Sequence, residues 1–167
     1  MLYENVRIFE SEERETEEFL EFIENLIMRK GVAFEIIMEI SLSIPLAKVF
    51  KKVYAVIKNF SIAEVLSKKL RELKITNVGV IVAERPPEVE FPIDLVILSN
   101  LQPLELLREY LCWAKKANFV IIAEWKEKEF SPLFENILKE ISRDFEILGV
   151  KNLSFCRFAL LKARNGK

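Results

Sequence analysis

Polar side chains able to do chemistry stand at or just after the predicted carboxyl ends of apolar strands. They are Glu39, Ser41, Glu84, Ser99 and Asn100. In an open parallel sheet a ligand crevice forms at those ends, so we expect these residues to share one rim. Carboxylates attract a cation or an amine there and repel a phosphate. The residue types therefore predict a small pocket that is acidic on one side.

Glu39 and Glu84 can also be explained without a ligand. Glu39 can be a solvent-facing acid at a strand end, and Glu84 an ordinary acid before the Pro86-Pro87 loop. A second group of acids, at positions 124, 127 and 129, alternates with lysines. Such alternation favours surface charge over a metal site, and we expect no metal. Basic clusters on two predicted helices lie among acids, which favours a solvated face over a nucleic-acid patch.

Composition excludes several classes of site. The chain has 167 residues, no histidine, four glycines and a formal net charge of −1. Histidine triads and histidine-ligated metals are therefore excluded, and the glycines cannot build a phosphate-cradling loop. Two cysteines are too few for a disulfide framework, so we expect a cytoplasmic protein, with Cys112 buried as a small apolar side chain. No apolar run is long enough to span a membrane. The glutamate and lysine bias is typical of thermophiles.

Strands and helices alternate along the predicted chain. An N-terminal helix covers residues 10–29, with Ser11 as its cap and an apolar stripe that the sheet or another subunit must cover, made of Phe19, Phe22, Ile23, Leu26 and Ile27. Further helices are predicted over 43–51, 61–74 (capped by Ser61), 103–116 and 131–142, and strands over 34–40, 53–58, 77–83, 93–98 and 118–124. Two last strands, 144–150 and 154–162, should form an antiparallel hairpin. The alternation predicts a single domain over residues 1–167, with a mostly parallel sheet in its core (34–162) between layers of helices.

Local sequence adds a resemblance to a known family. The segments that carry it are 42–48 (LSIPLAK), 52–57 (KVYAVI), 70–78 (LRELKITNV) and 91–100 (FPIDLVILSN). In this order and spacing they resemble four parts of class I S-adenosylmethionine (SAM) methyltransferases: the first helix, the second strand, the junction between a helix and the third strand, and the fourth strand with the loop that follows it. The resemblance runs over residues 15–162 and is nearest to the small-molecule, quinone-biosynthesis branch. It implies a three-layer Rossmann-like fold and SAM as the cofactor.

Departures from that family fall on its cofactor residues. Glu39 matches the acid that meets the methionine end of SAM, but the glycine turn after it looks deleted, leaving Ile40 and Ser41. Ile57 stands where an acid binds the ribose, while Glu84 matches the acid beside the adenine. Ser99 and Asn100 match positions that line the substrate mouth.

Two functions remain open from the sequence. The first is a methyltransferase-like protein with a degenerate SAM site, which binds another ligand or a partner and does no chemistry. The second is a SAM-dependent methyltransferase for a small molecule with an unusually short loop. A homo-oligomer or a protein partner is expected, and neither nucleic acid nor a membrane.

Overall fold

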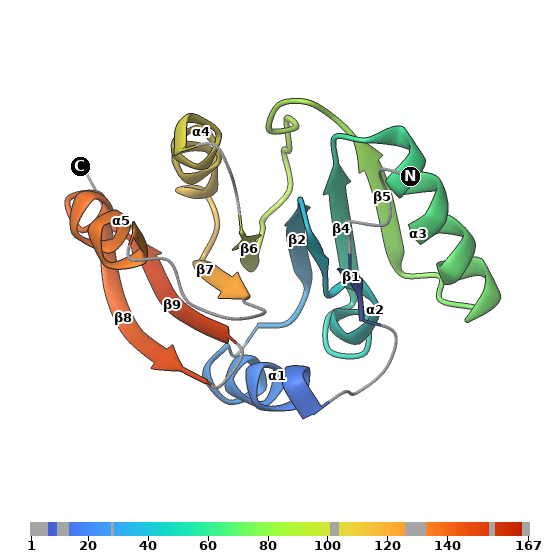
Figure 1. The fold of residues 1–167 in the computed structure, drawn as a ribbon, viewed down its shortest axis with the longest axis horizontal. Helices are drawn as coiled ribbons and strands as arrows, with labels where there is room; N and C mark the ends of the chain where they lie inside the picture. Colours follow the sequence, from blue (N-terminus) through green and yellow to red (C-terminus); the bar gives the residue numbers. More distant parts are fainter. Residues whose placement is uncertain are drawn as a thin grey trace.

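The central feature of the computed structural model is a mostly parallel sheet (Figure 1). The structure describes residues 7–9, 14–27, 29–100, 104–125, 133–153 and 156–164. Within these ranges seven strands form the sheet in the order β5-β4-β2-β6-β7-β9-β8. Their bounds are Val32–Ile37 (β2), Lys52–Ile57 (β4), Val78–Val82 (β5), Leu95–Ser99 (β6), Phe119–Trp125 (β7), Phe145–Asn152 (β8) and Cys156–Ala163 (β9). The strands from β5 to β7 are parallel, and β9 is antiparallel to both neighbours, which confirms the predicted sheet and its closing hairpin.

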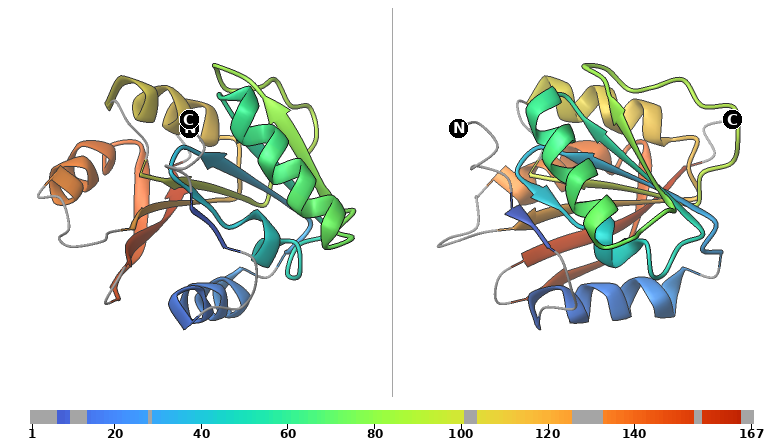
Figure 2. Two further views of the ribbon diagram at one scale, coloured as in Figure 1. Left: turned by 45° about the vertical axis from the view of Figure 1, so that its right-hand side comes forward. Right: turned by 90° about the vertical axis from the view of Figure 1, so that its right-hand side faces the viewer.

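Helices cover both faces of this sheet (Figures 1 and 2). One face packs against α1 (Arg14–Leu26), α2 (Ser43–Leu46) and α3 (Phe60–Glu72), and the other against α4 (Leu104–Ala114) and α5 (Leu133–Ile141). Because the central strands are buried on both sides, β2 and β6 consist of nearly continuous apolar residues. The result is the expected three-layer Rossmann-like architecture.

The N-terminal helix binds the sheet through its predicted stripe. Phe19 and Ile23 are fully buried, and Phe22 makes an edge contact with Phe158, with 4.7 Å between ring centroids. Leu26, the last residue of α1, was expected in the same stripe but is 46% exposed, whereas Ile27 after it is 1% exposed. The predicted cap, Ser11, lies outside the described residues.

Several predicted boundaries are wrong near the first strands. The strand predicted over 34–40 is β2, which ends at Ile37, and the helix predicted over 43–51 is the single turn α2. After α2 the chain continues in turns to Phe50, because β4 begins two residues later and the chain must reverse. Asn59, rather than Ser61, caps α3: its Oδ1 accepts hydrogen bonds from the amides of Ser61 and Ile62.

Two irregular connections lie beside the sheet, and the sequence pattern did not predict the first of them. A short strand β1 (Arg7–Ile8) pairs in parallel with β3 (Ile40–Ser41), between β2 and α2. The connection over residues 83–94 contains three prolines and forms no helix or strand. It is held down by Trp113, whose Nε1 donates to the carbonyl of Pro87 at 2.7 Å. Part of the α4 face is therefore covered by a loop.

Candidate functional site

Sheet register brings the two predicted acids to the same edge of the molecule. Ile37, Ile57 and Val82 are aligned across β2, β4 and β5, which are parallel. Glu39 and Glu84 each follow this aligned row by two residues, and both are exposed. They therefore lie beyond the same carboxyl edge, on strands separated by β4. Their roles in binding stay predictions.

Glu39 meets another predicted residue directly at this edge. Its Oε2 accepts a hydrogen bond from Nδ2 of Asn100 at 3.2 Å, although the two residues are 61 positions apart in the chain. Asn100 follows β6, the neighbour of β2 on the side away from β4. This is the switch point of the sheet, where successive connections leave in opposite directions. Within the described residues, Oε1 of Glu39 has no partner and remains available to a ligand.

Asn100 also joins the ends of two strands. Its backbone amide donates to Ala123, its Nδ2 donates to the carbonyl of Trp125 at 3.0 Å, and its Oδ1 accepts from the amide of Trp125 at 2.7 Å. Its φ of 48° lies in the left-handed region, which asparagine tolerates better than most residues. The Asn100 side chain thus holds β7 and Glu39 in place, which is a positioning role at the predicted substrate mouth.

The connection after β2 is longer than the predicted bounds of the strand and helix around it. Residues 38–42 separate β2 from α2, with a bend at Met38 and Glu39 followed by β3. No residue of this segment has a positive φ, so its path does not require glycine. The amides of Arg7 and Phe9 donate to the carbonyls of Glu39 and Ser41. Backbone that the family resemblance assigns to the cofactor is therefore paired with the N-terminal segment.

Beneath this segment lies Glu35, a buried acid that the sequence analysis missed. Glu35 is fully buried in β2, between Ala55 and Ile97 of the neighbouring strands. Its Oε2 accepts from the amide of Leu42 at 2.5 Å, and its Oε1 accepts from the Ser43 hydroxyl at 2.6 Å. A single acid inside a strand that is apolar on both faces was the available signal, since a buried carboxyl group needs partners.

The hydroxyl groups of the connection turn inward to this acid. Ser41 Oγ lies 3.5 Å from Glu35 Oε1 and accepts a weak bond from the Ser43 amide at 3.4 Å. Ser41 is 1% exposed, so it does not line the rim as predicted. Burial is the main influence on Glu35 and raises the pKa of its carboxyl from 4.5 to about 7. Hydrogen bonds from Ser43, Leu42 and Ser41 lower this pKa and offset only part of the effect.

Ser99 is also hidden from solvent. It ends β6, is fully buried, and its Oγ has no hydrogen-bond partner in the described part of the chain. A fully buried hydroxyl does not line an opening at the surface, so its place differs from the predicted substrate mouth.

The half of the edge that would face a nucleoside has mixed chemistry. Lys58 follows the predicted ribose position, Ile57, and is exposed. Phe60, the first residue of α3, exposes 64% of its surface, and Val82, the register partner of Ile57 at the end of β5, exposes 47%. The position that would bind the ribose hydroxyls therefore holds Ile57 instead of an acid, and the side chain next to it in the chain, Lys58, is a cation.

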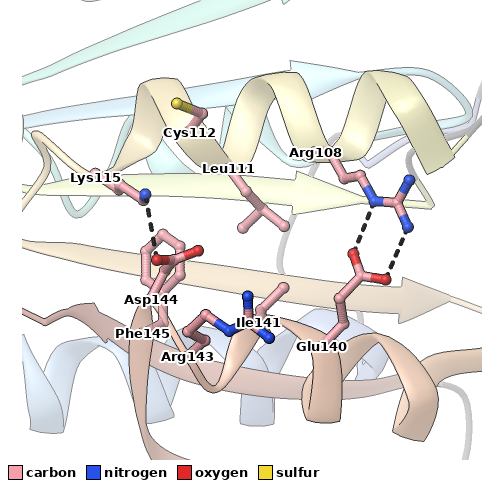
Figure 3. Close-up of a pocket in the computed structure, with 9 residues that line it drawn as sticks. All are labelled: Arg108, Leu111, Cys112, Lys115, Glu140, Ile141, Arg143, Asp144 and Phe145. Atoms are coloured by element: carbon pink, nitrogen blue, oxygen red, sulfur yellow. Dashed lines mark hydrogen bonds and ion pairs between the residues drawn. The ribbon is translucent and has the colours of Figure 1, made fainter.

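A groove of about 420 Å³ lies elsewhere, between α4 and α5 (Figure 3). Arg108 bridges to Glu140 with two contacts of 2.8 Å, and Lys115 lies 3.6 Å from Asp144. These pairs are exposed and contribute little to stability. Cys112 in this groove is exposed, which corrects the expectation that it is buried. None of the predicted site residues lines the groove.

Among the described residues, no three histidine, cysteine or acidic side chains converge to hold a metal. In the same part of the chain, no helix is both long and apolar enough to cross a membrane.

Comparison of the whole structure with solved structures decides the fold. The L11 ribosomal protein methylase of Lactobacillus delbrueckii subsp. bulgaricus aligns with a TM-score of 0.69 and 12% identity over 93% of this chain and 81% of the other. A SAM-dependent methyltransferase from Aquifex aeolicus aligns with 0.66 and 16% identity over 87% of each chain. The fold is that of the class I methyltransferases. No protein-family model and no curated protein matches the sequence.

A third structure shows what this fold holds elsewhere. TrmK of M. capricolum, in complex with S-adenosylhomocysteine, aligns with a TM-score of 0.62 and 18% identity over 88% of this chain and 68% of the other. At these identities the likeness shows the fold alone. The expected relation to the quinone-biosynthesis branch stays a prediction.

Proposed function

We propose that this chain is a methyltransferase-fold binding protein whose carboxyl-edge crevice takes a small amine-bearing ligand through Glu39, without methyl transfer. One observation carries the proposal: Glu39 is exposed at the switch point and is oriented there by Asn100. A carboxylate with an available oxygen, fixed by a neutral amide, favours an ammonium group over an anion. Glu84 lies at the same edge and adds a second negative charge.

The connection after β2 supports an altered ligand rather than SAM. The carbonyls of Glu39 and Ser41 are bonded to the N-terminal segment, and Ser41 and Ser43 turn their hydroxyls toward Glu35. Groups that are already paired inside the protein gain little by exchanging those partners for a ligand. Lys58 beside the ribose position gives the SAM hydroxyls no carboxylate.

Titration with SAM and S-adenosylhomocysteine tests the first half of the proposal. Because the backbone and the ribose acid are missing as partners, we expect both to bind more weakly than about 1 mM, or roughly −4 kcal/mol. Isothermal titration calorimetry on the full chain measures this directly. Binding in the micromolar range would overturn the altered-ligand proposal.

A titration with putrescine, a simple diamine, tests the second half. We expect a measurable thermal shift that disappears in Glu39→Gln, because the neutral amide keeps the shape and removes the charge. Glu146→Gln is the matched control, since Glu146 is an exposed acid on β8, away from the carboxyl edge. Equal shifts for both variants would show that putrescine binds only through general surface charge.

A second candidate function is SAM-dependent methylation of a small molecule. It is favoured by the agreement in fold with SAM-dependent methyltransferases and by Glu39, which matches the acid that meets the methionine end of SAM. Methyl transfer depends mainly on proximity and alignment of an activated donor, so the absence of histidine is compatible with it. Micromolar SAM binding lost in Glu39→Gln would favour this candidate.

A further inference from the structure

The two outer strands of the sheet are protected to very different degrees. β8 carries charged residues, and its pairing with β9 has an irregularity between Ile147 and Gly149. Charges and bulges are the common devices that keep an edge strand from pairing with another chain. β5, at the opposite edge, has the sequence VGVIV, with no charge, no proline and no irregularity in its register with β4. The right-hand view of Figure 2 turns this edge, with α3 beside it, toward the viewer.

The outer backbone groups of β5 belong to alternate residues. The carbonyl of Asn77 accepts from Val53 and the amide of Ala83 donates to Ile57, so these residues face β4. Backbone polar groups alternate in direction along a strand, so Val78, Val80 and Val82 face outward. Within the described residues, no segment pairs with them.

Exposed apolar side chains occur before β5 and at its end. Leu73 precedes β5 and is 44% exposed, and Val82 ends β5 and is 47% exposed. A large exposed apolar side chain is unremarkable alone, but two that flank a strand edge left unpaired within the described residues favour a contact surface there.

We infer that β5 pairs with β5 of a second copy of this chain, antiparallel and across a two-fold axis at Val80. In that register Val80 lies opposite its own copy, and Val78 lies opposite the partner's Val82. Each pair exchanges backbone hydrogen bonds, because its outward groups face each other. An isologous interface of this kind closes on itself and produces a dimer.

The charge pattern of α3 identifies a second copy as the occupant. The solvent side of α3 carries Glu64 in its N-terminal half, and Lys68, Arg71 and Glu72 in its C-terminal half, which is basic on balance. A two-fold axis at Val80 runs the two α3 helices antiparallel beside each other. The acidic half of each helix then lies toward the basic half of the other, and uncharged β5 strands bring no like charges together.

Sedimentation of three proteins tests the proposal. Over about 1 to 100 µM we expect wild type to sediment as a dimer, and Val82→Lys as a monomer with its dissociation constant raised at least about 100-fold, because lysine is the usual guard of an edge strand. The matched control is Val150→Lys on β8, where Val150 is 46% exposed against 47% for Val82. Circular dichroism confirms that both variants are folded. A monomeric wild type, a dimeric Val82→Lys or a dissociated Val150→Lys would each overturn the inference.

Amide hydrogen exchange tests the register. In the wild-type dimer, the outward amides of Val80 and Val82 should both be protected. The Val80 amide should exchange at least about tenfold more slowly in that dimer than in the Val82→Lys monomer. The amides of Gly79 and Ile81, which face β4, should be protected in both proteins. Fast exchange at Val80 in a dimeric sample would place the interface on another surface and contradict the pairing.

Discussion

The two connections that flank the switch point are stabilised in opposite ways. The one after β2 is held from below by Glu35, a buried carboxyl bonded to Leu42 and Ser43. The one after β6 begins at Asn100, a neutral amide at the surface end of the sheet that bonds to the backbone of Trp125. The first therefore depends on the protonation of a core group, and the second depends on backbone geometry. Glu39 lies between them and belongs to the first connection while it is oriented by the second.

Replacing Glu35 by leucine should have the largest effect on the stability of the fold. The substitution leaves the Leu42 amide and the Ser43 hydroxyl buried without their acceptor. Unsatisfied buried donors cost about 1–3 kcal/mol each, so we expect a loss of about 4 kcal/mol of unfolding free energy. Urea unfolding at pH 7 measures it. A loss below about 1 kcal/mol would show that Glu35 does not hold the connection.

Stability should also depend on pH through the same group. Because folding raises the pKa of Glu35 from 4.5 to about 7, the folded state holds a proton that the unfolded state releases. The protonated carboxyl contributes fully to stability below pH 4.5, the pKa of Glu35 in the unfolded chain. This contribution, about 3 kcal/mol in total, is lost as the pH rises from 4.5 through about 7.

Glu35→Gln should flatten that dependence. Its amide can accept from Leu42 and donate to Ser43, so the variant keeps the contacts without an ionisable group. Urea unfolding at pH 5 and pH 8 should give a smaller difference for the variant than for wild type. Identical pH profiles would mean that Glu35 does not titrate in this range.

The contribution of Asn100 to stability should depend on its hydrogen bonds and its backbone conformation instead of on pH. Asn100→Ala loses both side-chain bonds to Trp125 and places alanine at a φ of 48°, for an expected loss of about 2 kcal/mol. Asn100→Gly loses the bonds but relieves the backbone, and should lose about 1 kcal/mol less. Neither effect should change between pH 5 and pH 8. Equal losses for the two variants would show that the conformation costs nothing.

Substitution of Lys74 should have the smallest effect on stability, and it tests the cost of a positive φ at a position away from the candidate site. Lys74 follows α3 with a φ of 58°, and the Ile75 amide bonds back to Leu70 at 2.9 Å, as at a helix end that favours glycine. Lys74 lies outside the candidate site, so Lys74→Gly should stabilise the fold by about 1 kcal/mol. Lys74→Ala, which keeps a Cβ, is the control and should not stabilise. A thermal melt compares the three proteins.

Much of the fold follows from local patterns. Apolar runs such as 93–98 and 118–124 predict strands within one or two residues of β6 and β7, and the final hairpin is confirmed. Predictions failed where long-range contacts override propensity. The short α2, for example, gives way to turns that lead into β4, and Asn59 rather than Ser61 caps α3.

The sequence by itself determined the three-layer class and which residues follow the strands, because hydrophobic periodicity and strand direction are local properties. Only the tertiary structure decided what those residues touch. Asn100 meets Glu39 across 61 positions of the chain, and Arg7 and Phe9 occupy the backbone after β2. These contacts depend on sheet register and on how the N-terminal segment returns to the sheet. Glu35 shows both contributions. The sequence shows that an acid lies in an apolar strand. Only the tertiary structure buries it, which raises the pKa of its carboxyl, and gives it the hydrogen-bond partners through which it supports the candidate site.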